Sequence, residues 1–195
     1  MAGVPRAWAV LLLLVGTLLA ARPVAAPSVR LQDLDNKPVD PFQAAGSAAT
    51  VFVFTSVDCP ISNRYAPEVR RLYETFASQG VTFWLIYPNP RESAAQIRKH
   101  LKDYAYPVKA LRDPGHELVK LAGVAVTPET ALFDRKGALA YHGRIDDRYV
   151  GIGVERPAPT ERDLQVAISA VLAGKPVAVS SQPAAGGCYI ADFKP

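Results

Sequence analysis

Two short runs of β-branched and aromatic residues constrain the fold of this chain most strongly. Residues 49–55 are Ala-Thr-Val-Phe-Val-Phe-Thr, and residues 81–87 are Val-Thr-Phe-Trp-Leu-Ile-Tyr. Such short apolar runs predict strands that are covered on both faces of a sheet. From residue 61 to residue 79, apolar residues recur every three or four positions, and Gly80 follows, which predicts an amphipathic helix. A strand, a helix and a second buried strand indicate a parallel β-α-β unit.

The next segment repeats the alternation of helix and strand. Ser93 and Gln96 have the spacing of a capping box, and a helical pattern follows them. Residues 108–111 predict a third short parallel strand. Asp113 and Pro114 then predict the cap and the opening of a short helix.

After this segment the pattern changes to an antiparallel one. Residues 130–133 and 138–144 are two strand-like runs joined by the turn Asp-Arg-Lys-Gly, which predicts a hairpin. Thr160 predicts the start of a last helix that ends at Gly174. Residues 29–32, followed by turn residues at 33–37, predict a short edge hairpin or a lead-in strand. The sequence therefore predicts an α/β fold in which helices flank a mixed central sheet, with parallel strands first and the hairpin last.

Composition bounds the possible functions. The 195 residues are 49% hydrophobic and 21% charged, which suits one packed core. The formal net charge is only +4, and the longest basic runs, at residues 70–71 and 98–100, suit solvated helix faces, so we expect no nucleic-acid binding. The three histidines have no metal-ligand spacing and no glycine-rich phosphate loop is present, so we expect no metal and no cofactor.

The first 26 residues have the pattern of a secretory signal peptide. Arg6 precedes a 15-residue apolar run at residues 7–21, and small residues continue to Ala26. This run is shorter than the roughly 20 residues that cross a bilayer. We therefore expect cleavage within residues 20–26, export to the periplasm or the extracellular space, and no membrane association afterwards.

The two cysteines, Cys59 and Cys188, carry the candidate chemistry. Cys59 follows a buried strand and begins a helix, where the helix dipole and free backbone N–H groups favour its thiolate. Asp58 acts against this, because a neighbouring carboxylate raises the pKa of a thiol, and Arg64 lies one turn further on. The alternative is that Cys59 simply fills the core as a small apolar side chain.

Two segments carry a resemblance to a known family. Residues 54–62, Phe-Thr-Ser-Val-Asp-Cys-Pro-Ile-Ser, and residues 123–134, Gly-Val-Ala-Val-Thr-Pro-Glu-Thr-Ala-Leu-Phe-Asp, resemble the thioredoxin-like superfamily, most closely the secreted redoxin or AhpC/TSA-like members. The resemblance covers about residues 29–173. It implies a thioredoxin-like fold and an oxidoreductase that acts by thiol–disulfide exchange or peroxide reduction through Cys59.

The resemblance also assigns roles to neighbours of Cys59. Thr127 and Pro128 match the site of the family's cis-proline, which shapes the surface where a partner binds. Ser62 stands where the Cys-x-x-Cys motif has its second cysteine, so no local thiol resolves Cys59. Ser56 supplies a hydroxyl three residues before Cys59, and either Ser56 or Ser62 is expected to stabilise the Cys59 thiolate.

The sequence departs from peroxiredoxins at two positions. Phe52 replaces the proline of their Pro-x-x-x-Thr-x-x-Cys motif. The nearest candidate for their later arginine is Arg144, at the far end of the hairpin, where a local ion pair with nearby carboxylates is the simpler interpretation.

The C-terminal segment, residues 175–195, is rich in proline, serine and glycine, and we expect a flexible tail behind a domain at residues 27–174. An extended tail is long enough to bring Cys188 to Cys59. Three roles for Cys188 stay open: a resolving thiol, a structural disulfide, and pairing between chains. Expected partners are a protein thiol or disulfide, or a small peroxide; the alternative function is a secreted binding module with a static Cys59–Cys188 bond. No prediction of oligomeric state follows from the sequence.

Overall fold

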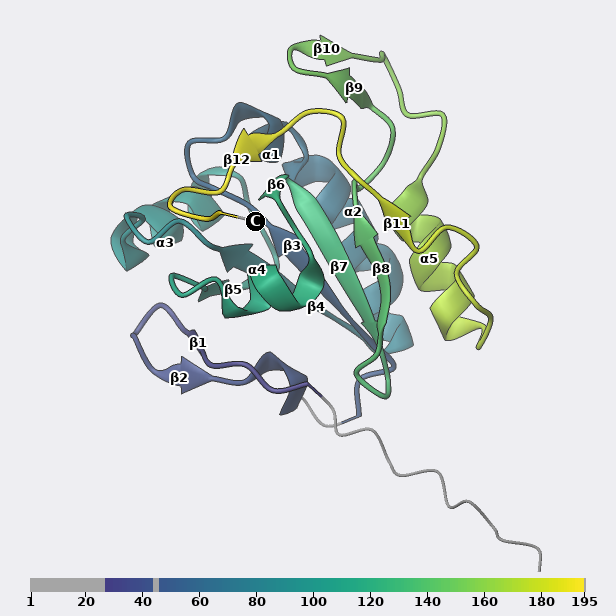
Figure 1. Cartoon of the computed structure of the whole chain (residues 1–195), viewed down its shortest axis with the longest axis horizontal. Coiled ribbons are helices and arrows are strands. Elements are labelled where there is room, and N and C mark those ends of the chain that lie inside the picture. The colour runs from purple at the N-terminus through teal and green to yellow at the C-terminus, as the bar shows by residue number, and fades with distance from the viewer. Residues whose placement is uncertain (1–26, 44–45, 195) are drawn as a thin grey trace, which may run out of the picture.

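The computed structural model describes residues 27–43 and 46–194 (Figure 1). The predicted signal peptide, residues 1–26, lies outside the described residues. Within them, an eight-stranded mixed sheet has the strand order β11-β8-β7-β3-β4-β5-β1-β2. Helices pack against this sheet, so the predicted α/β architecture is confirmed.

The predicted buried strands form the middle of the sheet. β3 (Ala49–Phe54) and β4 (Val81–Tyr87) run parallel, and β5 (Lys109–Arg112) extends the parallel part beside β4. β7 (Glu129–Asp134) pairs antiparallel with β3, and β8 (Leu139–Gly143) pairs antiparallel with β7. The predicted order of parallel strands followed by a hairpin is therefore confirmed.

The single helix predicted for residues 61–79 is wrong, because the helix is interrupted. α1 (Pro60–Arg64) ends at Tyr65, and α2 (Ala66–Phe76) continues into the 3-10 turn η2 (Ala77–Gln79). Pro67 lies in the first turn of α2. A proline has no N–H for the carbonyl four residues before it, so one regular helix cannot run through this position.

The predicted caps of the next two helices hold. Ser93 and Gln96 form a full capping box at the start of α3 (Ala94–Asp103). The Asp113 carboxylate accepts hydrogen bonds of 2.8–3.0 Å from three backbone N–H groups in the first turn of α4 (Glu117–Ala122). This helix begins three residues later than the Asp-Pro pair predicted.

The last helix begins differently from the prediction. α5 (Asp163–Leu172) starts three residues after Thr160 and has no side-chain cap. Thr160 instead donates its backbone N–H and its hydroxyl to the Asp147 carboxylate. The carboxylate comes from another part of the chain, so local spacing could not indicate this partner.

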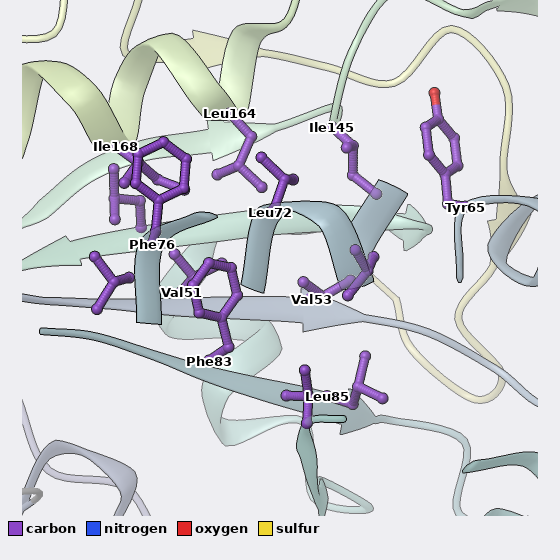
Figure 2. Packing of buried hydrophobic residues seen from close by; sticks show 14 of the residues in the cluster. Val51, Val53, Tyr65, Leu72, Phe76, Phe83, Leu85, Ile145, Leu164 and Ile168 are labelled. Atoms are coloured by element: carbon purple, nitrogen blue, oxygen red, sulfur yellow. The ribbon is translucent and has the colours of Figure 1, made fainter. Parts of the chain in front are cut away.

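Two apolar layers cover the central strands. Val51 and Val53 of β3 face α2 and α5, as Figure 2 shows, where they meet Leu72 and Ile168. The alternate residues Phe52 and Phe54 face the opposite side; their cluster includes residues of α4 and of the C-terminal segment, Leu118, Val119, Ala122 and Ile190. The sheet is therefore covered on both faces, as the continuous apolar runs predicted.

Several strands of two or three residues complete the structure. β1 (Leu31–Gln32) pairs antiparallel with both β2 (Pro38–Val39) and β5, which confirms a short hairpin at the edge of the sheet with β2 outermost, and a 3-10 turn η1 (Pro41–Gln43) follows. The others were not predicted: β6 (Val126–Thr127), the hairpin of β9 (Tyr149–Gly151) and β10 (Val154–Glu155), β11 (Ser181–Gln182) and β12 (Cys188–Tyr189). Strands this short form only where another strand pairs with them, because so few residues cannot show the alternation of apolar and polar side chains that predicts a strand.

The C-terminal segment crosses the domain from α5 toward α1, drawn in yellow in Figure 1. β11 pairs parallel with β8, and β12 pairs antiparallel with β6. Gly143 permits the first contact, because a Cβ there would collide with the backbone of Gln182. Among the described residues, no helix is long and apolar enough to cross a membrane.

Candidate active site

Cys59 occupies the predicted junction between β3 and α1. Its backbone is extended (φ −84°, ψ 108°) and it is the N-cap residue of α1, with Pro60 next to it. The Cys59 carbonyl accepts the backbone N–H of Asn63 at 3.0 Å, which is the first helical bond. Only 1% of Cys59 is exposed.

Cys59 and Cys188 form a disulfide within the chain. Their Cα atoms are 6.1 Å apart across a sequence separation of 129 residues. Antiparallel pairing of β12 with β6 places Cys188 opposite Thr127, and the Thr127–Pro128 peptide is cis. The carbonyl oxygen of Thr127 lies 3.3 Å from the Cys59 Sγ. Four residues that the sequence singled out therefore meet at one place: Cys59, Cys188, Thr127 and Pro128.

Neither of the two predicted serine hydroxyls is hydrogen-bonded to Cys59 in this structure. Ser56 donates its hydroxyl to Glu92 at 2.6 Å, so in this disulfide-bonded form its hydrogen is directed away from Cys59. Ser62 is buried, and within the described part of the chain its hydroxyl has no hydrogen-bond partner. A role of either hydroxyl at a Cys59 thiolate stays a prediction.

Glu92 supports the loop before Cys59. One carboxylate oxygen accepts from the Ser56 hydroxyl and from the Val57 backbone N–H, at 2.6 and 2.8 Å. The other oxygen is buried without a partner among the described residues. Burial raises the pKa of Glu92, and the two hydrogen bonds act in the opposite direction. The sequence does not single out Glu92, because a lone glutamate beside a helix cap looks like any surface carboxylate.

A second buried group extends this network beneath the loop. Asn63 donates to the Val57 carbonyl at 3.2 Å, and its side-chain oxygen is 2.7 Å from His100 Nε2. His100 Nδ1 is 2.7 Å from the Tyr87 hydroxyl. The consistent assignment has neutral His100 donating from Nε2 and accepting at Nδ1. Burial lowers the pKa of His100, against a smaller opposite effect of Asp103 and Asp58, and so favours the neutral ring.

The charged residues near the disulfide pair with other partners. The Arg64 guanidinium lies 2.9 Å from the Glu155 carboxylate of β10, while Asp58 is exposed. Arg144 pairs with Asp163 at 2.8 Å and with a neighbouring glutamate, Glu161, at 2.5 Å. Arg144 therefore forms an ion pair at the end of β8, as expected, but its partners lie 17 and 19 residues further along the chain and are not the adjacent Asp146 and Asp147.

The C-terminal segment is anchored on both sides of Cys188. Glu129 of β7 joins it to the domain: one oxygen accepts from the Ala184 backbone N–H at 3.0 Å, and the other from the Ala125 backbone N–H at 3.0 Å. Ile190 is only 6% exposed and packs in the cluster that contains Phe52. Beyond it, Asp192 forms an ion pair with Arg91 at 2.7 Å.

The disulfide of this site can accept two electrons, which would convert it to two thiols of the same chain. Its buried sulfur lies at a helix start, and its other sulfur is carried by a docked strand. In residues 27–43 and 46–194, no group of three His, Cys, Asp or Glu side chains is placed to hold a metal ion.

Comparisons with known proteins agree with this architecture. The AhpC/TSA family matches residues 24–142. A search of curated proteins found no match. Among solved structures, a conserved protein from Geobacillus kaustophilus is 29% identical with a TM-score of 0.72, covering 89% of this chain and 92% of that one. A hypothetical protein from Sinorhizobium meliloti is 30% identical with a TM-score of 0.70, covering 86% and 92%.

A third solved structure confirms the thioredoxin-like fold. It is a secreted disulfide oxidoreductase from Mycobacterium tuberculosis, described as homologous to E. coli DsbE. It is 19% identical with a TM-score of 0.51, covering 75% of this chain and 96% of that one. At this identity the similarity concerns the fold alone.

Proposed function

The chain belongs to the AhpC/TSA family, and from this membership we propose that it is an exported thiol–disulfide oxidoreductase in which Cys59 and Cys188 form one redox-active pair. One observation carries the proposal: Cys59, at the start of α1 and beside Thr127–Pro128, is bonded to a cysteine of the same chain. A bond within one chain supports a resolving or a structural role for Cys188.

The pair can exchange two electrons with a partner. In the reduced protein, the Cys59 thiolate attacks a partner disulfide, forms a mixed disulfide and releases one partner thiolate. The Cys188 thiolate then attacks the Cys59 sulfur, which forms the intrachain bond and releases the second partner thiolate. The released thiolates take up protons from water. Cys188 thus supplies the second thiol that Ser62 cannot provide.

Peroxide is the second substrate class for the same thiol. Attack by Cys59 would give a sulfenic acid and water or an alcohol, and condensation with the Cys188 thiol would release water and form the disulfide. Arg144, the nearest match to the arginine of peroxiredoxins, is paired with Asp163 and Glu161. This pairing favours thiol–disulfide exchange as the principal reaction.

The burial of the site favours one competing function. Cys59 is almost fully buried and Ile190 holds the segment beyond Cys188 in the core, as in a structural staple. A secreted binding module with a static bond would have a reduction potential below about −300 mV. A redox-active pair would titrate at a higher potential.

The test is the intact mass of the mature protein after thiol alkylation across a series of redox buffers. We expect one reversible transition in which both thiols appear together, at a potential above about −300 mV. Resistance to all but the strongest reductants would refute the redox proposal and support the static module. Cys59→Ser should abolish turnover with a protein disulfide and with peroxide, whereas Cys188→Ser should stop the cycle at a mixed disulfide on Cys59.

Export is supported by the leader in the sequence, residues 1–26. Expression of the full chain in a bacterium with an envelope should place the protein outside the cytoplasm. Its new N-terminus should lie within residues 21–27. Retention of the intact leader in the cytoplasm would refute this part of the proposal.

A further inference from the structure

The two sulfurs of the disulfide differ in accessibility. Cys59 is almost fully buried, whereas Cys188 is only partly buried. Cys188 also lines a hollow of about 320 Å³, and Cys59 does not. Which sulfur a thiolate attacks depends on access as well as on the leaving group.

From this difference we propose that reduction begins at Cys188, and that the incoming thiol is a cysteine of a protein dithiol flanked by apolar residues. It enters through the hollow between α1 and the β9–β10 hairpin. This inference rests on the proposed function, because it names the entry point and the partner class of the same redox pair.

The lining of the hollow fits an apolar partner segment. Beside Cys188, the hollow is lined by Ile61 of α1 and by Tyr149 and Ile152 of the hairpin. The charged residues of the lining, Arg64 and Glu155, form an ion pair with each other. The lining itself therefore carries one positive and one negative charge, and Glu155 also lies 3.7 Å from Arg148, outside the lining.

This neutrality argues against a small anionic thiol as the natural reductant. Glutathione carries a net negative charge and would be recognised best by an unpaired cation. The one cation of the lining, Arg64, is already neutralised by Glu155. A protein cysteine between neutral apolar side chains matches the lining better.

The surface around the hollow extends the apolar character. Ile152, at the tip of the hairpin, is 82% exposed, and Tyr189, next to Cys188, is 89% exposed. Val154 of β10 is exposed as well. The hairpin projects from the end of the domain where β12 lies (Figure 1). Of these residues, Ile152 lines the hollow itself, and exposed large apolar side chains in the elements beside a reactive bond are typical of a surface that binds a protein.

The exchange balances with the partner's two thiols. The first partner thiolate attacks the Cys188 Sγ, so a partner–Cys188 bond forms, the Cys59–Cys188 bond breaks, and the electron pair leaves on Cys59 at the start of α1. The second partner thiol, after loss of its proton to water, attacks the first partner sulfur. The partner becomes a disulfide, Cys188 leaves as a thiolate, and water protonates it. Two electrons have then passed to the Cys59–Cys188 pair.

The first experiment identifies the attacked sulfur. The oxidised full chain is mixed with a thioredoxin that keeps only its attacking cysteine, free thiols are alkylated at once, and the linked peptides are identified by mass spectrometry. We expect thioredoxin on Cys188 and the alkyl group on Cys59. The reverse pattern, with thioredoxin on Cys59, would overturn the inference.

The second experiment tests the surface. Ile152→Ser should slow reduction of the oxidised protein by reduced thioredoxin about tenfold and leave reduction by dithiothreitol unchanged. Val166→Ser, at an exposed valine of α5, is the matched control and should change neither rate. An unchanged rate with thioredoxin in Ile152→Ser, or equally fast reduction by glutathione and thioredoxin, would overturn the partner assignment. If dithiothreitol itself reduces the bond only below about −300 mV, the proposed function fails instead.

Discussion

Replacing Gly187 by alanine tests whether the docked tail controls the disulfide. A Cβ on Gly187 would lie 2.8 Å from the Val126 Cγ2, 2.9 Å from the Val126 Cβ and 3.0 Å from the Thr127 carbonyl oxygen. These distances are shorter than normal carbon contacts. The carbonyl of Thr127 also lies 3.3 Å from the Cys59 Sγ, so it cannot retreat without disturbing the bond. We expect the strand that carries Cys188 to shift instead.

The cost of this collision gives the size of the effect. Forcing an extra methyl group into a packed site costs about 1–3 kcal/mol. In the reduced protein the tail is free of the covalent link and can move away, so the cost falls on the oxidised form. For a two-electron couple, 30 mV corresponds to about 1.4 kcal/mol. The reduction potential of Gly187→Ala should therefore rise by about 20–60 mV.

The assay is equilibration in glutathione or dithiothreitol redox buffers, followed by alkylation and intact mass. Gly115→Ala is the matched control, since a Cβ there meets nothing within 4 Å, and its potential should not change. A potential for Gly187→Ala that equals the wild-type value would refute the reasoning. It would mean that the pairing of β12 with β6 does not hold the bond closed, or that the tail stays docked equally in both redox states.

Three further predictions concern stability. Cys188→Ser should lower the free energy of unfolding in urea by up to about 5 kcal/mol, the chain-entropy value for a loop of 129 residues, and a loss below about 1 kcal/mol would contradict this. Because burial raises the pKa of folded Glu92 above its unfolded value, its stabilising contribution is complete below the unfolded pKa and is lost as pH rises through the folded pKa. Glu92→Gln keeps both acceptor bonds, so its melting temperature should rise relative to that of the wild type as pH rises. Exposed Glu74→Gln is the control and should show no such trend. A melting-temperature difference between Glu92→Gln and wild type that stays constant across pH would count against the buried carboxylate. Asp113→Ala should cost about 1–3 kcal/mol in urea unfolding by leaving three N–H groups of α4 without their acceptor, against no measurable loss in Glu74→Ala, and equal stability of the two variants would contradict the capping role.

The central fold could be predicted because its signals are local and repeated. Residues 49–54 and 81–87 contain enough β-branched and aromatic side chains to specify buried strands, and the capping box at Ser93 specifies where α3 begins. Pro67 also indicates the break of the first helix, but the apolar periodicity continues across it and predicts one unbroken helix. The start of α5 could not be predicted, since Thr160 bonds a carboxylate 13 residues away.

The sequence by itself determined the chemistry that is possible: one thiol at a strand-to-helix junction, no second thiol at Ser62, and one other cysteine near the C-terminus. Only the tertiary structure decided that Cys188 lies opposite Thr127 and that a buried network of Glu92 and His100 lies beneath the loop. A nucleophile's place follows from local pattern, because a strand end and a helix start are specified by neighbouring residues. The loop of 129 residues is closed by two-residue strands and by single buried contacts. These contacts stabilise the closed loop only after the rest of the domain has formed the strand edge and the pocket that receive them.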